Sequence, residues 1–301
     1  MKEIVDRTCC SLLRFAICIT MFAVSSSSPA QTKRALVFGV SGYPQSTNYS
    51  WGNIHGSNDA DLVTSVLNRQ GFKTVKICNQ AATSKRIRKE LKNLPATCRP
   101  GDLVYIHFSC HGQPFEDNNG DEEDGWDESI VPYDALKIYK KKVYEGQNHI
   151  TDDELNTYFN KVRRVVGPKG YVCVVVDACH AGGSSRGEDD IDDEELYVRG
   201  TKSGFSPNGK EFRPRINAKS NFKIPHDKGL ADITILEACR SYESNYEIKK
   251  DGKYYGPLTY FVSQTLAKQQ LSRSLDWVKQ VQNLMKENLT RQNMVYETSI
   301  K

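Results

Sequence analysis

Five short apolar runs, separated by amphipathic helical patterns, constrain the fold of this 301-residue chain more than any other feature. The runs cover residues 35–40, 73–78, 103–109, 171–177 and 233–239. Strands that are apolar along their whole length are buried on both faces, as in a parallel sheet with helices on each side. We therefore expect an α/β fold with a mostly parallel central sheet between two helical layers.

The segments between these runs have helical periodicity. In the first of them Ala60, Val63, Val66 and Leu67 share one face of a helix. Thr151 opens a Thr-Asp-Asp-Glu capping box, and Thr83 or Ser84 is the expected cap of another helix. The expected helices cover residues 59–70, 84–94, 151–162, 257–268 and 274–289.

Polar residues gather where the predicted strands end. The sequence SCHG (residues 109–112) follows the third strand, DACH (177–180) ends the fourth, and Asp59 lies just beyond the loop after the first. In open parallel sheets, sites form at the carboxyl ends of the strands. We expect these three clusters to converge at one edge of the sheet.

Two cysteines of the fourth run differ in chemistry. Cys173 lies between valines inside the strand, where burial raises a thiol pKa, whereas Cys179 lies past the strand end beside small residues. Cys179 is therefore the better nucleophile. Its neighbour His180 points to the other side of an extended chain, so His111 on a neighbouring strand is the expected base. We expect His180 to have a packing or loop role.

These elements resemble the caspase and metacaspase clan, and the type I metacaspases with their bacterial caspase-like relatives most of all. The similar elements, in order, are residues 56–60 (GSNDA), the strand ending in Ser-x-His-Gly, the acidic run before 132–134 (PYD), 150–154 (ITDDE), and the strand ending in Asp-x-Cys-His-x-Gly. The resemblance implies a caspase-like three-layer α/β/α sandwich over residues 31–301 and a cysteine endopeptidase. One departure is Cys110, which stands where the family usually has glycine.

The resemblance also implies roles for the site residues. Cys179 and His111 form the catalytic dyad, and the backbone N–H groups of Cys179 and Gly112 form the oxyanion hole. Asp59, Ser109 and Asp177 match the pocket for the side chain preceding the cut (the S1 pocket). Two carboxylates in that pocket favour a cation, so we expect cleavage after Arg or Lys. No organic cofactor is implied.

An acidic run at 116–128 (EDNNGDEEDGWDE) raises the question of calcium. Its spacing approaches an EF-hand loop, but Glu122 stands where that loop needs glycine, and no flanking helices are predicted. The family resemblance implies a different calcium site, at Asp127, Asp152, Asp153 and an acid beyond Cys179, for which Asp189 is the candidate. The alternative is a solvated acidic loop.

Residues 184–229 read as a long exposed loop with no periodicity. Residues 199–228 carry eight Lys or Arg against two acids. Long loops are usually functional or disordered, so this one is either a flexible insertion or a self-cleavage linker that would make the chain a zymogen. The candidate processing residues are Arg186, Arg199, Lys202, Lys210, Arg213, Arg215, Lys219, Lys223 and Lys228.

The first 30 residues differ from the rest. Residues 15–24 (FAICITMFAV) have the length of a signal-peptide core and are followed by SSSSPAQ, so we expect a signal peptide over 1–30 and a secreted or periplasmic protein; the alternative is a hydrophobic first helix. Its removal leaves six of the nine cysteines, with no paired spacing. We expect mostly reduced, buried thiols, Cys239 among them, although Cys78 and Cys98 could form a disulfide.

Charge and spacing also limit the partners. A net charge of +4 is too small to indicate nucleic acid, and no apolar stretch is long enough to span a membrane. We expect a monomer that acts on peptides or proteins containing Arg or Lys. The competing hypotheses are a catalytically weak caspase-like domain that binds partners, and a metal-binding protein using Cys110, His111, Cys179 and His180. The latter lacks the close ligand pairs of structural zinc sites.

Overall fold

A computed structural model describes residues 31–45, 49–120, 122, 124–179, 197–201, 203–213 and 221–301. These belong to one compact unit, Gln31–Lys301. The expected signal peptide lies outside the described residues. Within them, no helix combines the length and the apolar character that crossing a membrane requires.

The central sheet has seven strands in the order β2-β1-β3-β7-β9-β12-β8. The first five are parallel, and β12 joins β9 in the antiparallel sense. This confirms the predicted mostly parallel sheet. Their bounds are β1 Lys33–Gly39, β2 Lys73–Cys78, β3 Leu103–Ser109, β7 Tyr171–Asp177, β8 Asn221–Lys223, β9 Asp232–Glu237 and β12 Val295–Thr298.

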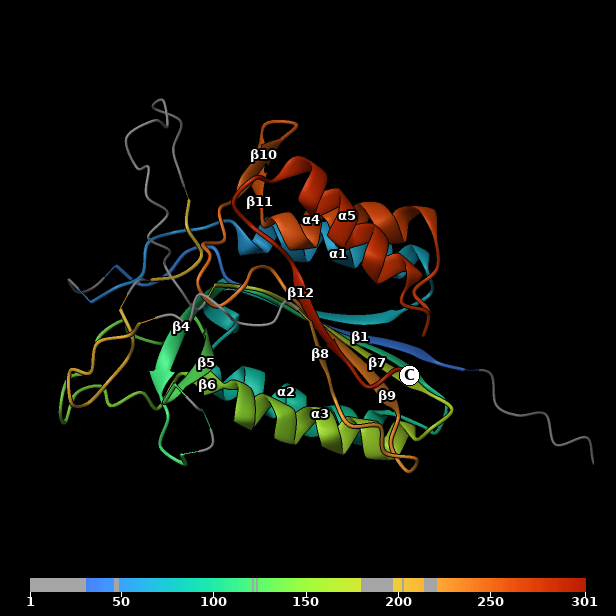
Figure 1. Ribbon diagram of the computed structural model, residues 1–301, viewed down its shortest axis with the longest axis horizontal. Helices are drawn as coiled ribbons and strands as arrows, with labels where there is room; N and C mark the ends of the chain where they lie inside the picture. Colours follow the sequence, from blue (N-terminus) through green and yellow to red (C-terminus); the bar gives the residue numbers. More distant parts are fainter. Residues whose placement is uncertain are drawn as a thin grey trace, which may run out of the picture. The chain divides into compact units, whose positions relative to one another are not determined.

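Helices cover both faces of this sheet (Figure 1). On one face lie α1 (Gly56–Arg69), α4 (Pro257–Lys268) and α5 (Asp276–Asn288); on the other lie α2 (Ser84–Thr97) and α3 (Asp152–Val166). Alternate residues of β7 supply the two cores. Val172, Val174 and Val176 pack toward α2 and α3, whereas Tyr171, Cys173 and Val175 pack toward the other three helices. The predicted three-layer sandwich is confirmed.

Local sequence fixes where the helices begin and end. The Thr83 side chain accepts a hydrogen bond from the Arg86 N–H, and that of Thr151 accepts one from Glu154, so both are N-caps. Gly167, at φ 65°, ends α3 four residues beyond the predicted end. The extra turn is stabilised by Val166, which is buried in the core.

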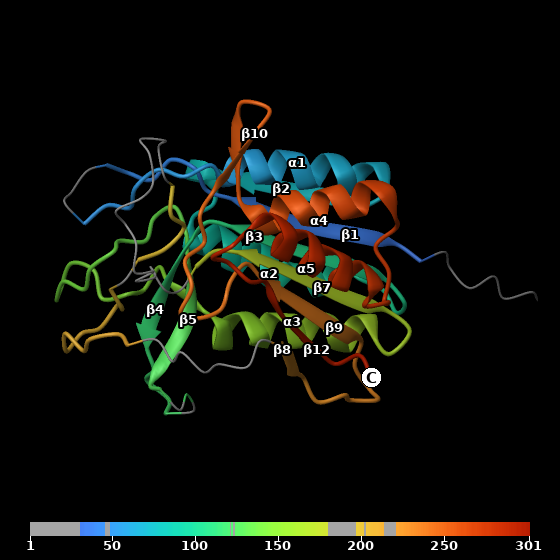
Figure 2. The same ribbon diagram turned by 45° about the horizontal axis from the view of Figure 1, so that its top comes forward.

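Several short strands were not predicted from the sequence. β4 (His111–Glu116), β5 (Trp126–Val131) and β6 (Ile150–Thr151) form a small antiparallel sheet, of which Figure 2 shows β4 and β5 beside the main sheet. A separate pair is formed by β10 (Ile248–Lys250) and β11 (Lys253–Tyr255). A proline in β4 and two acids in β5 interrupt any apolar run. These strands depend on pairing with each other, which local periodicity does not report.

The prediction of one exposed loop over 184–229 is wrong for residues 197–201 and for Phe205, whereas most of the other described residues of this stretch are exposed. Arg199 and Phe205 are 0% and 1% exposed. The Phe205 ring stacks on Phe115 with centroids 5.1 Å apart, and its N–H donates to the Pro114 carbonyl at 2.7 Å. A single phenylalanine or arginine in a basic stretch gives no periodic signal, yet each fills a pocket made by distant elements.

Candidate active site

Strand register brings the predicted site residues to one edge of the sheet. Gly39 of β1 pairs with Ser109 of β3, which pairs with Asp177 of β7. The residues that follow these strand ends therefore start from adjacent positions. The predicted convergence of the three polar clusters is confirmed by this pairing.

Cys179 is completely buried, two residues beyond the end of β7. Its Sγ donates to the Glu243 carbonyl at 3.0 Å, and its backbone N–H donates to the Arg199 carbonyl at 2.9 Å. Cys173 lies inside β7, where burial raises its thiol pKa. Between these two cysteines, only Cys179 faces the edge where the polar residues gather.

His111 is held by backbone and aromatic contacts. Its Nε2 lies 2.9 Å from the Gly52 carbonyl, and its ring stacks on Trp51 with centroids 4.8 Å apart. A carbonyl can only accept, so Nε2 carries the proton and Nδ1 carries a lone pair. Burial lowers the pKa of His111 to about 3. The imidazole is therefore neutral at physiological pH and has a nitrogen free to accept a proton.

Two backbone N–H groups converge on one carbonyl oxygen. The Cys179 N–H lies 2.9 Å from the oxygen of Arg199, and the Gly112 N–H lies 3.2 Å from it. These are the two donors expected to form an oxyanion hole. The carbonyl between them belongs to Arg199, a residue of the loop that was predicted to be exposed.

The Arg199 side chain fills the predicted S1 pocket, called the acidic pocket below. The Arg199 guanidinium contacts the Asp59 carboxylate and the Ser109 hydroxyl at 2.7 Å each, with Asp177 at 3.7 Å. All these side chains are buried. The three residues predicted for the S1 pocket thus surround a cation, as two converging carboxylates favour.

Glu247 is a further pocket residue that the sequence interpretation missed. Its carboxylate accepts hydrogen bonds from Nε and Nη2 of Arg199 at 3.1 and 2.7 Å. Its other oxygen lies 2.5 Å from Nδ1 of His55. Glu247 follows β9 by ten residues, in a segment with no strand or helix pattern. The only available signal was that β9 ends at the same edge as the other parallel strands.

The acidic pocket is built on a rigid base. Asp177 accepts hydrogen bonds from the N–H and hydroxyl of Thr259 at 2.7 Å each, and from Asn245 at 2.7 Å. The Gly256 N–H donates to Asp59 at 3.0 Å. A Cβ at Gly256 would lie 2.2 Å from the Asp177 carboxylate, so glycine is required for this approach. Burial raises the pKa of Asp59 to about 7, although Arg199 opposes the shift.

The remaining cysteines divide into core and site residues. The six from Cys78 to Cys239 are free thiols, and Cys110 is buried with a pKa raised to about 12 by burial. Cys239, expected to be structural, lies beside the nucleophile candidate: its Sγ shares the Glu243 carbonyl at 3.5 Å. The Cys179 side chain and burial raise the pKa of Cys239.

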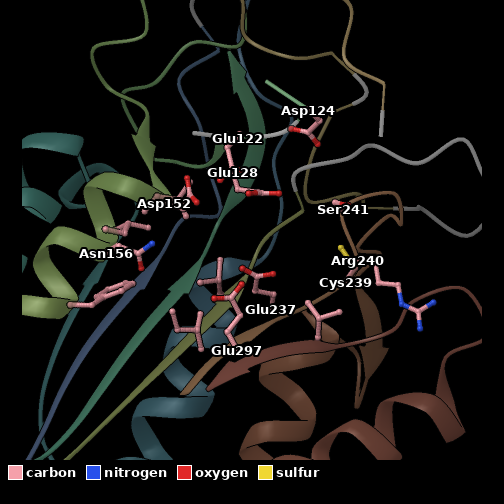
Figure 3. A pocket seen from close by; sticks show the side chains of 16 residues that line it. Glu122, Asp124, Glu128, Asp152, Asn156, Glu237, Cys239, Arg240, Ser241 and Glu297 are labelled. Carbon is pink, nitrogen blue, oxygen red and sulfur yellow. The ribbon is translucent and has the colours of Figure 1, made fainter. Parts of the chain in front are cut away.

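An acidic cavity of about 320 Å³ lies beside Cys239 (Figure 3). Glu128, Asp152 and Glu237 point into it from β5, α3 and β9. Burial and neighbouring carboxylates raise the pKa of Asp152 to about 7 and that of Glu237 to about 8. Glu128 is shifted upward for the same reasons.

Of the predicted calcium ligands, Asp152 lines this cavity. The Asp127 and Asp153 carboxylates both raise the pKa of Asp152, and Asp152 keeps one buried oxygen without a hydrogen-bond donor among the described residues. Carboxylate oxygens fit calcium chemically. Yet the described part of the chain contains no group of three His, Cys, Asp or Glu close enough to hold a metal. Asp189 lies outside it.

The other candidates are dispersed or not described. His180, Arg186, Lys202, Arg215 and Lys219 lie outside the described residues. Lys210, Arg213, Lys223 and Lys228 are exposed. Lys210 donates to the Gly125 carbonyl at 3.0 Å, and Arg213 pairs with Glu211 at 2.9 Å. Of the candidate processing residues whose positions are described, Arg199 alone contacts the acidic pocket.

Comparison with known proteins agrees with this arrangement. The family model described as "Caspase domain" matches residues 32–300. The chain is 33% identical over 164 residues to "Metacaspase-2" of Arabidopsis thaliana, covering 50% of this chain and 34% of that protein. It is 27% identical over 270 residues to "Metacaspase-1" of Schizosaccharomyces pombe, covering 77% and 60%.

A solved structure shares the fold. Protein GSU0716 from Geobacter sulfurreducens superposes with a TM-score of 0.60 at 18% identity, covering 90% of this chain and 94% of that one. The chain spans about a third to three fifths of the length of the two metacaspases.

Proposed function

The chain belongs to the caspase domain family, and from that premise we propose that it is a cysteine endopeptidase that cuts after arginine and cleaves its own Arg199–Gly200 bond. Cys179 is the nucleophile and His111 the base in this proposal. Asp59, Ser109, Asp177 and Glu247 bind the side chain before the cut. The proposal names the arginine that the sequence alone left among nine candidates.

One observation carries the proposal: a single residue occupies both halves of the site. The Arg199 carbonyl accepts from the Cys179 and Gly112 N–H groups, while its guanidinium contacts three carboxylates. Such a residue presents the bond that follows it to the thiol. A Cβ at Gly200 would lie 3.1 Å from the Cys179 Cβ, which supports the close approach of that bond to the nucleophile.

The first half of the reaction forms a thioester. The Cys179 thiol gives up its hydrogen bond to Glu243, His111 Nδ1 takes the proton, and Sγ attacks the Arg199 carbonyl carbon. Negative charge that develops on the oxygen is stabilised by the two N–H donors, which contribute about 3 to 4 kcal/mol each in such sites. His111 then donates the proton to the Gly200 nitrogen as the peptide bond breaks.

The second half releases the enzyme. Water loses a proton to His111 and attacks the thioester, and the collapse of the tetrahedral intermediate returns the thiol and leaves the Arg199 carboxylate. His111 is suited to both steps because its Nε2–H keeps donating to the Gly52 carbonyl. The low pKa of the buried imidazole keeps Nδ1 unprotonated before each transfer.

The pocket favours arginine over lysine. Glu247 is contacted by two guanidinium nitrogens and Asp59 by a third. A lysine ammonium is a compact point charge and cannot reach both carboxylates with this geometry. We expect kcat/KM to be higher for arginine than for lysine peptides by roughly tenfold or more.

Incubation of the purified full chain tests the proposal. Mass spectrometry of the products should reveal a new N-terminus at Gly200 in the wild type, and none in Cys179→Ala or Arg199→Gln. Lys210→Gln is the matched control, because Lys210 is exposed and should not alter the cut. Cleavage that persists in Cys179→Ala would disprove the assigned nucleophile. A partner-binding domain without catalysis would yield no new N-terminus in any variant.

Calcium dependence is a separate part of the proposal. Asp127, Asp152 and Asp153 would hold the ion, with Asp189 as the expected fourth ligand. Burial and then the neighbouring Asp127 and Asp153 carboxylates raise the pKa of Asp152, and this concentration of acids supports a cation there. Calorimetry with and without calcium tests this independently of cleavage.

A further inference from the structure

We propose that this enzyme also recognises an aromatic side chain two residues before the arginine, in a pocket formed by His55 and Tyr254. The inference rests on the proposed cleavage after arginine and extends it to the third residue before the cut. The preferred substrate class is then a peptide with Tyr, Phe or Trp, any residue, and Arg.

The chain preceding the cut is bound as a strand. The Arg199 N–H donates to the Asn245 carbonyl at 3.0 Å, and the Glu247 N–H donates to the Tyr197 carbonyl at 2.9 Å. Val198 pairs with Tyr246 in the antiparallel sense. Residues 197–199 thus add an edge strand to residues 245–247, which is a general mode of peptide recognition.

Strand geometry places the third residue on the same side as the arginine. Side chains alternate along an extended chain, so Tyr197 and Arg199 point the same way while Val198 points away. The Tyr197 side chain therefore reaches a pocket next to the acidic one. The first and the third residue before the cut, Arg199 and Tyr197, therefore occupy two adjacent pockets.

That neighbouring pocket is aromatic. The His55 ring meets Tyr197 edge-on, with centroids 4.6 Å apart and planes at 90°. Tyr254 meets it at 4.9 Å and 65°, and His55 and Tyr254 stack on each other at 5.0 Å. Three rings at these distances form a favourable aromatic cluster.

The two walls of the pocket are fixed by the rest of the site. Glu247 accepts from the His55 backbone N–H at 2.7 Å and also contacts its ring, and the same carboxylate binds the Arg199 guanidinium. The Tyr254 carbonyl accepts from Asn58 at 3.0 Å. Glu247 thus joins the two pockets.

Peptide hydrolysis by the full chain tests the inference. Fluorogenic acetyl-Tyr-Val-Arg and acetyl-Ala-Val-Arg peptides are compared by kcat/KM, and we expect the tyrosine peptide to be favoured about tenfold. In Tyr254→Ala the ratio should fall to about two, and in Tyr254→Phe it should stay near the wild-type value. Tyr260→Ala is the matched control, because Tyr260 lies on α4 and packs on Tyr255 rather than on Tyr197.

The outcomes distinguish the aromatic pocket from the proposed cleavage after arginine. Equal hydrolysis of both peptides by the wild type would overturn the aromatic pocket and leave cleavage after arginine intact. Hydrolysis of neither peptide would overturn both. If Tyr254→Ala did not fold, self-cleavage of Tyr197→Ala against Tyr197→Phe would replace it. We expect the alanine variant to be about tenfold slower, and equal rates would contradict the proposal.

Discussion

Two groups of acids, one buried and one partly buried, have opposite surroundings. Asp59, Asp177 and Glu247 surround the Arg199 guanidinium, with contacts of 2.7 to 3.7 Å. Glu128, Asp152 and Glu237 line a cavity of about 320 Å³, in which burial and mutual repulsion raise the pKa of each. The guanidinium of Arg240, which also lines that cavity, is engaged by Glu243 and Tyr242.

The difference shows that burial of carboxylates does not by itself define a function. In the first group a cation from the same chain compensates the charges, and hydrogen bonds from Thr259, Asn245 and Gly256 hold the acids in place. In the second group burial and mutual repulsion raise the pKa of each acid, which favours the protonated form. The first group is thus compensated within the chain, whereas the second is the one that we propose to bind calcium.

The largest expected effect separates the two groups directly. Glu247→Gln should lower kcat/KM for arginine peptides by about 100-fold or more, because one partner of a buried ion pair is removed. Glu237→Gln, in the acidic cavity, should change it by less than about threefold. Steady-state kinetics on one arginine peptide measures both. Equal losses in the two variants would mean that the groups do not differ as described.

Gly200→Ala tests how closely the residue after Arg199 must approach Cys179. A Cβ at this position would lie 2.3 Å from the Cys179 carbonyl oxygen, so the chain must shift away from the nucleophile. We expect self-cleavage after Arg199 to slow by roughly 30-fold, the cost of an overpacked contact. The time course of the new N-terminus measures it. A wild-type rate would show that the bound chain relaxes freely.

Calcium binding tests the second group. Asp152→Asn removes one carboxylate charge and should weaken calcium affinity by about tenfold in calorimetry. Asp59→Asn, in the first group, should leave that affinity near the wild-type value. Calcium that binds both variants and the wild type equally would exclude Asp152 as a ligand.

The smallest expected effect is a pH dependence of the first group. Burial raises the pKa of Asp59 to about 7, so at pH 6 most of this carboxyl is neutral and attracts arginine weakly. As the pH rises through 7 the group ionises, and kcat/KM should increase about fivefold by pH 8. His111, with its pKa near 3, stays neutral over this range. Asp59→Asn should flatten the profile, and an unchanged slope would assign it to another group.

The fold could be predicted largely from the sequence because its strands carry their own signal. β2, β3 and β7 have the predicted bounds, since a continuous apolar run bounded by polar residues specifies a strand buried on both faces. β4, β5 and β12 could not be predicted, because they depend on pairing across the chain. Asp127 and Glu128 interrupt the apolar pattern of β5.

The site was predictable to the extent that it lies at strand ends. Ser109, Asp177 and the residues just after them follow from strand register alone. Glu247, His55 and Tyr254 lie on loops and on a short hairpin whose positions are set by tertiary packing. Arg199 was one of nine equivalent basic residues in the sequence, and only the three-dimensional arrangement distinguishes it.

The Phe205 ring, held among Phe115, Tyr139, Tyr144 and His149, has a kinetic consequence for the proposed cut before Gly200. It anchors the chain on the far side of that bond, as Arg199 does on the near side, so we expect both fragments to stay attached after the proposed hydrolysis. Encounter between bond and thiol would then take place within one molecule at a high effective concentration. The half-time of the reaction should not change on dilution, and the nicked product should migrate as a single particle under native conditions.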